Sequence, residues 1–118
     1  GGDSIDLSGS IVNLNNISCK YIKDKCLSVG EKSILNANKI FSDKSGTAVA
    51  TKDGSYGKIL GLFVTNNKGI SAMVYNKKSG YGKSTLILRD TNIQFSDSLN
   101  SIQAVLVTKF TLAFITPG

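Results

Sequence analysis

The chain has 118 residues, the size of one small domain, and it carries 14 basic against 8 acidic side chains, a formal net charge of +6. It contains no histidine, so catalytic groupings built on imidazole are excluded, and two cysteines without histidine do not make a metal site. Arg89 is the only arginine, and a lysine-rich surface is poorly suited to reading bases, so we expect no specific nucleic-acid partner and no cofactor.

Five segments share one alternating apolar pattern and recur about every 22 residues, with a longer last interval that indicates an insertion. Units of this length are too small to bury their own apolar face and must stack on their neighbours, so the repeat predicts a solenoid. The paired positions are Ile5 and Leu7, Leu27 and Val29, Val49 and Thr51, Ile70 and Ala72, and Ile102 and Ala104.

A second apolar pattern has the same period and follows each of the first four segments. An inward residue is followed three positions later by another and two positions after that by a third, which indicates a strand that bends without leaving the coil. The triplets are Leu14, Ile17 and Cys19; Ala37, Ile40 and Ser42; Ile59, Leu62 and Val64; and Leu88, Thr91 and Ile93. Each coil is therefore expected to hold two short strands that pair in parallel with those of the next coil, about 4.8 Å away.

The pieces GGDSIDLSGS, DKCLSVGEKS, GTAVATKDGS and ISAMVYNKKSGYGKSTL resemble the right-handed parallel β-helix of the pectin-lyase-like superfamily, in particular modules of bacterial CotH-type and other cell-surface proteins. The resemblance covers residues 1 to about 95. It implies a fold and an extracellular or envelope location. It does not imply one activity, because such β-helices include polysaccharide lyases, hydrolases, adhesins and modules without assigned chemistry.

The predicted fold is thus an all-β, right-handed parallel β-helix of about five coils, with residues 1–98 as coils and 99–118 as a last coil and cap. The sequence lacks the regular leucine pattern of leucine-rich repeats, which argues against that fold. No segment sustains the period of an amphipathic helix, which argues against a helical solenoid. The first residues fall within a repeat, which favours a fragment of a longer β-helix over a chain whose end pairs with another copy. The apolar tail is too short and interrupted for a membrane span, and a cap over the open coil end is favoured over a subunit contact.

The two cysteines lie seven residues apart across one turn. In the repeat, Cys19 faces inward, whereas Cys26 precedes the inward Leu27 and is expected to face outward. A disulfide requires Cβ atoms about 4 Å apart, so opposed directions favour a buried Cys19 and a separate, partly exposed Cys26 thiol.

Carboxylates occur at only a few repeat positions. Glu31 and Asp53 are predicted to stack at one turn of adjacent coils, where Lys32 and Lys52 would neutralise them in an ion ladder. A cation or sugar site there is the less favoured alternative, and catalysis the least favoured. Asp6 is expected alone on its outward face, below Ser28, Ala50 and Ser71, without the carboxylate cluster of a calcium-dependent lyase.

One segment, residues 76–84, leaves the coil in the fourth repeat and concentrates lysine and tyrosine. A plain surface turn is the favoured interpretation. The alternative is a contact surface for a sugar ring or an acidic group, because aromatic rings would lie beside ammonium groups. The candidate binding residues are Tyr75, Lys77, Lys78, Tyr81 and Lys83.

Taken together, the sequence favours a non-catalytic structural or carbohydrate-binding module of a surface or envelope protein. Its expected partners are an acidic polysaccharide or another protein chain at the coil ends. The alternative is a fragment of a polysaccharide-active β-helix enzyme whose active site lies mostly outside this stretch.

Overall fold

A computed structural model describes residues 2–78, 80–94, 102–104 and 110–115, the last two ranges as backbone alone. The described elements are all β-strands. They are β1 (Ile5–Ser8), β2 (Ile11–Lys20), β3 (Lys25–Gly30), β4 (Ile34–Asp43), β5 (Thr47–Lys52), β6 (Tyr56–Thr65), β7 (Ala72–Tyr75), β8 (Ser84–Gln94), β9 (Ile102–Ala104) and β10 (Phe110–Ile115). No helix in the described part of the chain is long and apolar enough to cross a membrane.

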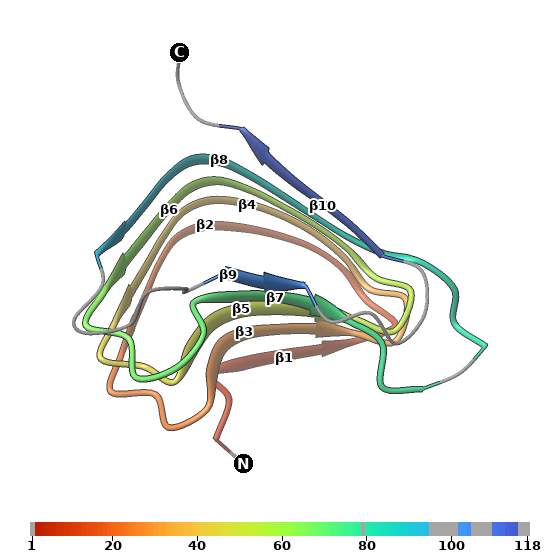
Figure 1. Ribbon diagram of the computed structural model, residues 1–118, viewed down its shortest axis with the longest axis horizontal. Coiled ribbons are helices and arrows are strands. Elements are labelled where there is room, and N and C mark those ends of the chain that lie inside the picture. Colours follow the sequence, from red (N-terminus) through yellow and green to blue (C-terminus); the bar gives the residue numbers. More distant parts are fainter. Residues whose placement is uncertain (1, 79, 95–101, 105–109, 116–118) are drawn as a thin grey trace.

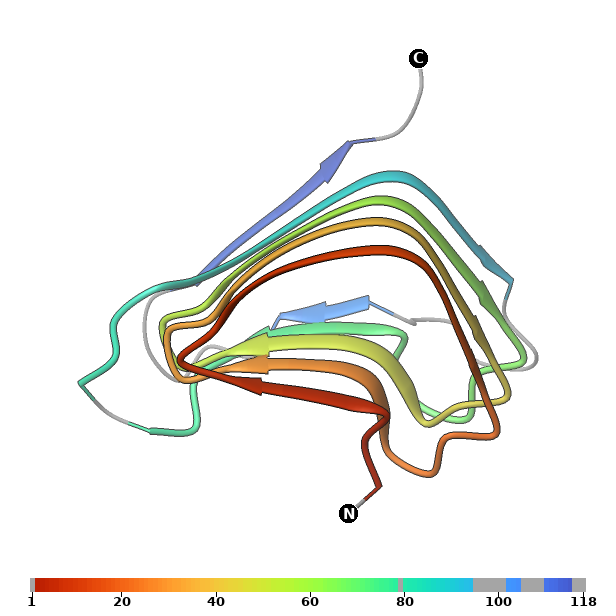
Figure 2. The same cartoon turned by 180° about the vertical axis from the view of Figure 1, so that it is seen from behind.

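The strands form two parallel sheets that face each other across the core (Figure 1). The odd-numbered strands make one sheet, in the order β1-β3-β5-β7-β9, and the even-numbered strands make the other, in the order β10-β8-β6-β4-β2. Each coil supplies one strand to each sheet, so the chain is the parallel β-solenoid that the repeat predicted. Seen from behind, the four long strands β2, β4, β6 and β8 bend together over the flatter first sheet (Figure 2).

The regular stack is about three coils, fewer than the five predicted. The fourth coil carries the insertion between β7 and β8, and the fifth is described only in β9 and β10. The predicted cap includes residues 99–101, 105–109 and 116–118, which lie outside the described residues.

The core consists of vertical columns of inward side chains, and the second apolar pattern is confirmed at every position. Leu14, Ala37, Ile59 and Leu88 occupy equivalent places in successive strands. The other two columns are Ile17, Ile40, Leu62 and Thr91, and Cys19, Ser42, Val64 and Ile93. Across the core, the first sheet contributes buried residues such as Leu27 and Val49.

The bend in each long strand lies at a residue in the left-handed backbone region. These residues are Asn16, Lys39, Gly61 and Asp90, with φ of 58°, 57°, 86° and 56°. A single left-handed residue bends the strand and adds one residue between two inward side chains, so that their spacing is three in place of two. The inward side chains on both arms of the strand therefore point to the same core.

Serine side chains join the coils at the turn that leads from the first sheet to the second. Ser33 Oγ accepts a hydrogen bond from Ser10 N at 3.2 Å, and Ser55 Oγ accepts one from Ser33 N at 3.0 Å. Ser84 Oγ accepts from Gly54 N at 3.0 Å. The serines of the EKS, DGS and GKS pieces thus satisfy backbone donors that would otherwise be unpaired where the ladder is interrupted.

The predicted register of the fourth coil is wrong by two residues. Val49 pairs with Ala72 instead of Ile70, and Thr51 pairs with Val74. Ile70 lies in the preceding turn and is only half-buried. A shift of two leaves the inward and outward faces unchanged, so alternation alone could not detect it.

The same shift corrects the column above Asp6, which continues through Ser28 and Ala50 to Met73 instead of Ser71. Although Ser28 and Ala50 lie on the outward face, both are fully buried. This part of the sheet therefore has less open surface than the alternating pattern suggested.

Cys19 and Cys26 form a disulfide, with Cα atoms 5.8 Å apart, contrary to the separate thiols that the sequence favoured. Tyr21, at φ 58°, begins the turn between β2 and β3. The two strands belong to different sheets that meet at this corner, so the direction of one cysteine relative to its own strand does not predict the direction of the other. Both cysteines are buried against the core.

The core position of Ile59 predicts a large effect of a buried charge. In Ile59→Asp the carboxylate would enter a fully buried column without a partner, and we expect a loss of several kcal/mol in the free energy of unfolding, measured by urea denaturation. The control is Lys58→Asp, which adds the same group at the adjacent outward position and should have little effect. Equal stability of the two variants would contradict the register.

The disulfide predicts a second stability difference. Closure of a loop with a sequence separation of 7 restricts the unfolded chain, so Cys19→Ser/Cys26→Ser should unfold about 2 to 3 kcal/mol more easily than the oxidised protein. Wild type measured with a thiol reductant should approach the variant. Identical urea midpoints with and without reductant would contradict a disulfide in the folded protein.

Candidate functional site

The predicted lysine and tyrosine loop folds back onto the coil. The buried Asn76 holds its base, because Asn76 Oδ1 accepts hydrogen bonds from Asp53 N and Ser84 Oγ while Asn76 Nδ2 donates to Gly82 O. Asp53 is buried beside it, and its Oδ1 accepts from Lys77 N at 2.7 Å and Lys78 N at 2.8 Å. The loop is therefore anchored to the turn below it.

Glu31, which directly follows β3 and lies one coil below Asp53, contacts the same loop. Its carboxylate accepts hydrogen bonds from Ser8 Oγ at 2.9 Å, Lys78 Nζ at 3.1 Å and Tyr81 Oη at 3.3 Å. The hydrogen bond from Lys78 is the largest cause that lowers the pKa of Glu31 below its ordinary value, and the same contact raises the pKa of Lys78. Two of the predicted binding side chains, Lys78 and Tyr81, thus already have a partner within the chain.

The two predicted carboxylates gather with their lysine neighbours but do not act as a free pair. A small pocket of about 110 Å³ is lined by Asp6, Leu7, Gly30, Glu31, Lys52, Asp53, Lys77 and Lys78. Asp53 is directed to backbone N–H groups and Glu31 to Lys78. Among the described ion pairs, Glu31 is therefore paired with Lys78 and not with the expected Lys32 or Lys52, and Asp53 is satisfied by backbone groups of the loop.

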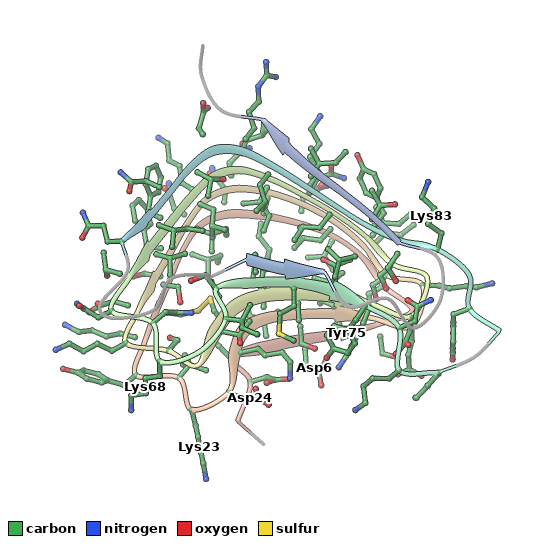
Figure 3. All side chains as sticks on the ribbon, in the orientation of Figure 1. Asp6, Lys23, Asp24, Lys68, Tyr75 and Lys83 are labelled. Atoms are coloured by element: carbon green, nitrogen blue, oxygen red, sulfur yellow. A yellow bond between two sulfur atoms is a disulfide. The ribbon has the colours of Figure 1, made fainter. Side chains whose placement is uncertain are left out.

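Of the remaining candidates, Lys77 lines the small pocket beside Lys78, whereas Tyr75 and Lys83 lie apart from each other. Tyr75 lies on β7 near Lys25, and burial raises the pKa of its phenol. Lys83 projects from the far side of the loop, away from Tyr75 (Figure 3). Among the described residues, no group of three metal-ligating side chains comes together.

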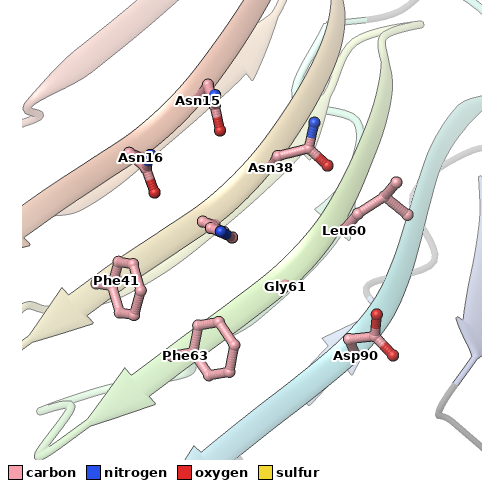
Figure 4. A pocket seen from close by; sticks show the side chains of 9 residues that line it. Asn15, Asn16, Asn38, Phe41, Leu60, Gly61, Phe63 and Asp90 are labelled. Atoms are coloured by element: carbon pink, nitrogen blue, oxygen red, sulfur yellow. The ribbon is translucent and has the colours of Figure 1, made fainter.

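A larger hollow lies elsewhere, over the bend of the long strands (Figure 4). This groove has a volume of about 810 Å³. Its walls are formed by residues of β2, β4, β6 and β8: Asn15, Asn16, Asn38, Lys39, Phe41, Leu60, Gly61, Phe63 and Asp90.

Two phenylalanines form the apolar part of the groove. Phe41 and Phe63 pair across β4 and β6, and their rings stack with centroids 5.0 Å apart and an interplanar angle of 18°. Their side chains are 42% and 36% exposed, an unusual position for large apolar groups. The pair could have been found from sequence, because the two residues are one period apart and lie at outward positions next to Ile40 and Leu62.

The polar part of the groove comes from carboxamides and two charges. Asn15 and Asn38 pair on β2 and β4, and Leu60 continues their column on β6. Lys39 and Asp90 occupy left-handed bend positions on β4 and β8. In the described part of the chain neither is in an ion pair, since the three ion pairs there involve Lys25 and Lys78.

Another exposed aromatic residue, Tyr21, follows β2 at the corner between the two sheets. The ammonium groups of Lys20 and Lys44 are 5.5 Å and 5.2 Å from the centroid of the Tyr21 ring, which is 65% exposed. Lys44 Nζ also donates to Tyr21 Oη at 3.2 Å. This cluster has the combination of aromatic ring and cations that the sequence assigned to the loop.

Comparisons of the chain with protein-family models, with curated proteins and with solved structures find no match. The strand pairing shows a parallel β-solenoid, whereas no match supports membership of the pectin-lyase-like superfamily or of CotH-type proteins.

The contact between Glu31 and Lys78 predicts a pH-dependent stability. Because the folded pKa of Glu31 is lowered, its contribution is present above the unfolded value, near 4.5, and is lost as pH falls through the folded pKa. At neutral pH the melting temperature of wild type should be higher than that of Glu31→Gln. The difference should be small, because the group is exposed, and it should vanish in acid. In a Lys78→Gln background the same substitution should have less effect. A difference that does not change with pH would contradict the contact.

Proposed function

We propose that this chain is a carbohydrate-binding β-solenoid module and that a glycan occupies the groove over the bend of β2, β4, β6 and β8. The observation that carries the proposal is the stacked, exposed pair Phe41 and Phe63 on one wall of a groove of about 810 Å³. A volume of this size is typical of small-molecule sites.

The chemistry of the lining suits a sugar. The C–H faces of a pyranose ring pack against aromatic rings, which bury apolar area while the hydroxyl groups stay hydrated or bonded. Carboxamides donate and accept at once, as hydroxyl groups do, so Asn15 and Asn38 can satisfy either role of a hydroxyl. The two amides are about 4.8 Å apart along the solenoid axis, which allows both to contact one ring.

The solenoid itself supplies rigidity. Each groove residue projects from a strand that is hydrogen-bonded to its neighbours, so little ordering is required on binding. No described constellation carries a reaction, and we propose binding without catalysis.

We also propose that the module belongs to a bacterial surface or envelope protein of the pectin-lyase-like kind. The disulfide between Cys19 and Cys26 supports an oxidising location, because such bonds persist outside the cytosol and are rare within it. The parallel β-solenoid supports the family at the level of the fold only.

An acidic polysaccharide is a second candidate ligand. The observation that favours it is the cluster of Lys20, Tyr21 and Lys44, where two cations flank an exposed ring. Binding at this cluster would depend on salt, because exposed charges are screened over about 8 Å at physiological ionic strength.

The groove is tested by titrating the protein with neutral pentaoses, namely cello-, laminari-, manno- and chitopentaose, and with pentagalacturonate. Wild type should bind at least one of them, and Phe41→Ala/Phe63→Ala should weaken that binding by about tenfold or more, because the ring contacts are lost. Melting curves would verify that the exposed substitutions leave the fold intact.

The control is Lys77→Ala/Lys78→Ala/Tyr81→Ala, which removes the predicted loop site and should leave binding unchanged. If only this control variant lost binding, the glycan site would lie at the loop and not in the groove. Binding of pentagalacturonate alone, retained in the phenylalanine variant and lost at high salt, would place the contact at Tyr21. No binding to any probe would overturn the proposal.

A further inference from the structure

The bend positions form a column in which one side chain is missing. Asn16, Lys39, Gly61 and Asp90 lie in successive strands, all with positive φ, and three of the four carry polar side chains. The other three positions adopt left-handed backbone with side chains, at φ of 56° to 58°, and Gly61 lies further into the positive range at 86°. Gly61 therefore leaves a gap in an otherwise filled column.

The gap opens into the groove beside the aromatic pair. A Cβ placed on Gly61 would lie 3.4 Å from Phe63 Cε2 and 3.5 Å from Lys39 N, so the Phe63 ring borders the space. Leu60 lies next to Gly61 on β6, and Asp90 lies on the adjacent strand β8 (Figure 4). Lys39 and Asp90 are two coil spacings apart, about 9.6 Å along the axis, with Gly61 between them.

The charge of the groove is balanced, in contrast to the +6 of the whole chain. Its lining holds one cation, Lys39, and one anion, Asp90. Such a site gives no net attraction to a polyanion. It fits hydroxyl groups, which accept from an ammonium group at one end and donate to a carboxylate at the other.

We propose that Gly61 defines the subsite for one neutral hexose unit, which packs on Phe63 and lies between Lys39 and Asp90. This inference rests on the proposed glycan-binding function and adds the class of sugar and the residue that admits it. The hexose takes the place that a side chain at position 61 would fill.

The decisive variant is Gly61→Asn, which refills the column with the residue found at Asn16 and so suits the left-handed backbone. It should lose about tenfold or more in affinity for the neutral pentaose that wild type binds. The matched control is Gly9→Asn, another left-handed glycine, where a Cβ would have only Glu31 O nearby, at 3.9 Å, far from the groove. It should bind as wild type does.

A second variant keeps the test informative if Gly61→Asn does not fold. Asp90→Lys suits the same column, as Lys39 shows, and makes the groove cationic. It should weaken binding of the neutral pentaose by about tenfold and raise that of pentagalacturonate. Wild-type binding of the neutral pentaose should be nearly the same in about 0.1 M and about 1 M NaCl.

The outcomes separate the two proposals. Wild-type affinity in Gly61→Asn, together with loss in Phe41→Ala/Phe63→Ala, would overturn the subsite and leave the groove as the glycan site. Binding of pentagalacturonate alone would overturn the neutral class, while glycan binding would stand. Absence of binding to every probe would overturn both.

Discussion

Backbone hydrogen bonding between equivalent strands of successive coils is the constraint on which the rest of this structure depends. Every described strand pairs in parallel with the strand one coil above or below it, so a side chain at a given repeat position always lies over its equivalent. The core, the serine turns and the aromatic pair are all consequences of that superposition. A coil that lost its register would lose all three at once.

Stacking also determines how the surface can acquire a site. A single outward phenylalanine on a strand is a minor exposed group, whereas two of them one period apart become a stacked platform. The same holds for Asn15 and Asn38. At Gly61, between Lys39 and Asp90, the column of side chains is interrupted, and these three residues line the groove. The lining of the groove thus comes from strand residues and not from a loop.

The insertion between β7 and β8 has the opposite character. Its lysine and tyrosine content made it a candidate contact surface, as the alternative to a plain turn. In the structure the buried Asn76 and Asp53 bind its backbone, and Glu31 accepts hydrogen bonds from Lys78 and Tyr81. A loop that crosses a turn with unpaired N–H groups is stabilised when nearby carboxylates accept from them. The acidic residues at this turn therefore have a structural partner in the loop.

The sequence by itself determined the architecture, because side-chain period and backbone pairing are local properties that repeat along the chain. The inward columns that begin at Leu14, Ile17 and Cys19, the bend in each long strand and the insertion could all be predicted from spacing. Spacing could not decide the fourth register, since a shift from Ile70 to Ala72 preserves alternation. The disulfide and the groove depended on the tertiary structure. Whether Cys19 meets Cys26, and whether Phe41, Gly61 and Asp90 border one hollow, depends on where two sheets meet and how a bend is shaped, and neither is set by local period.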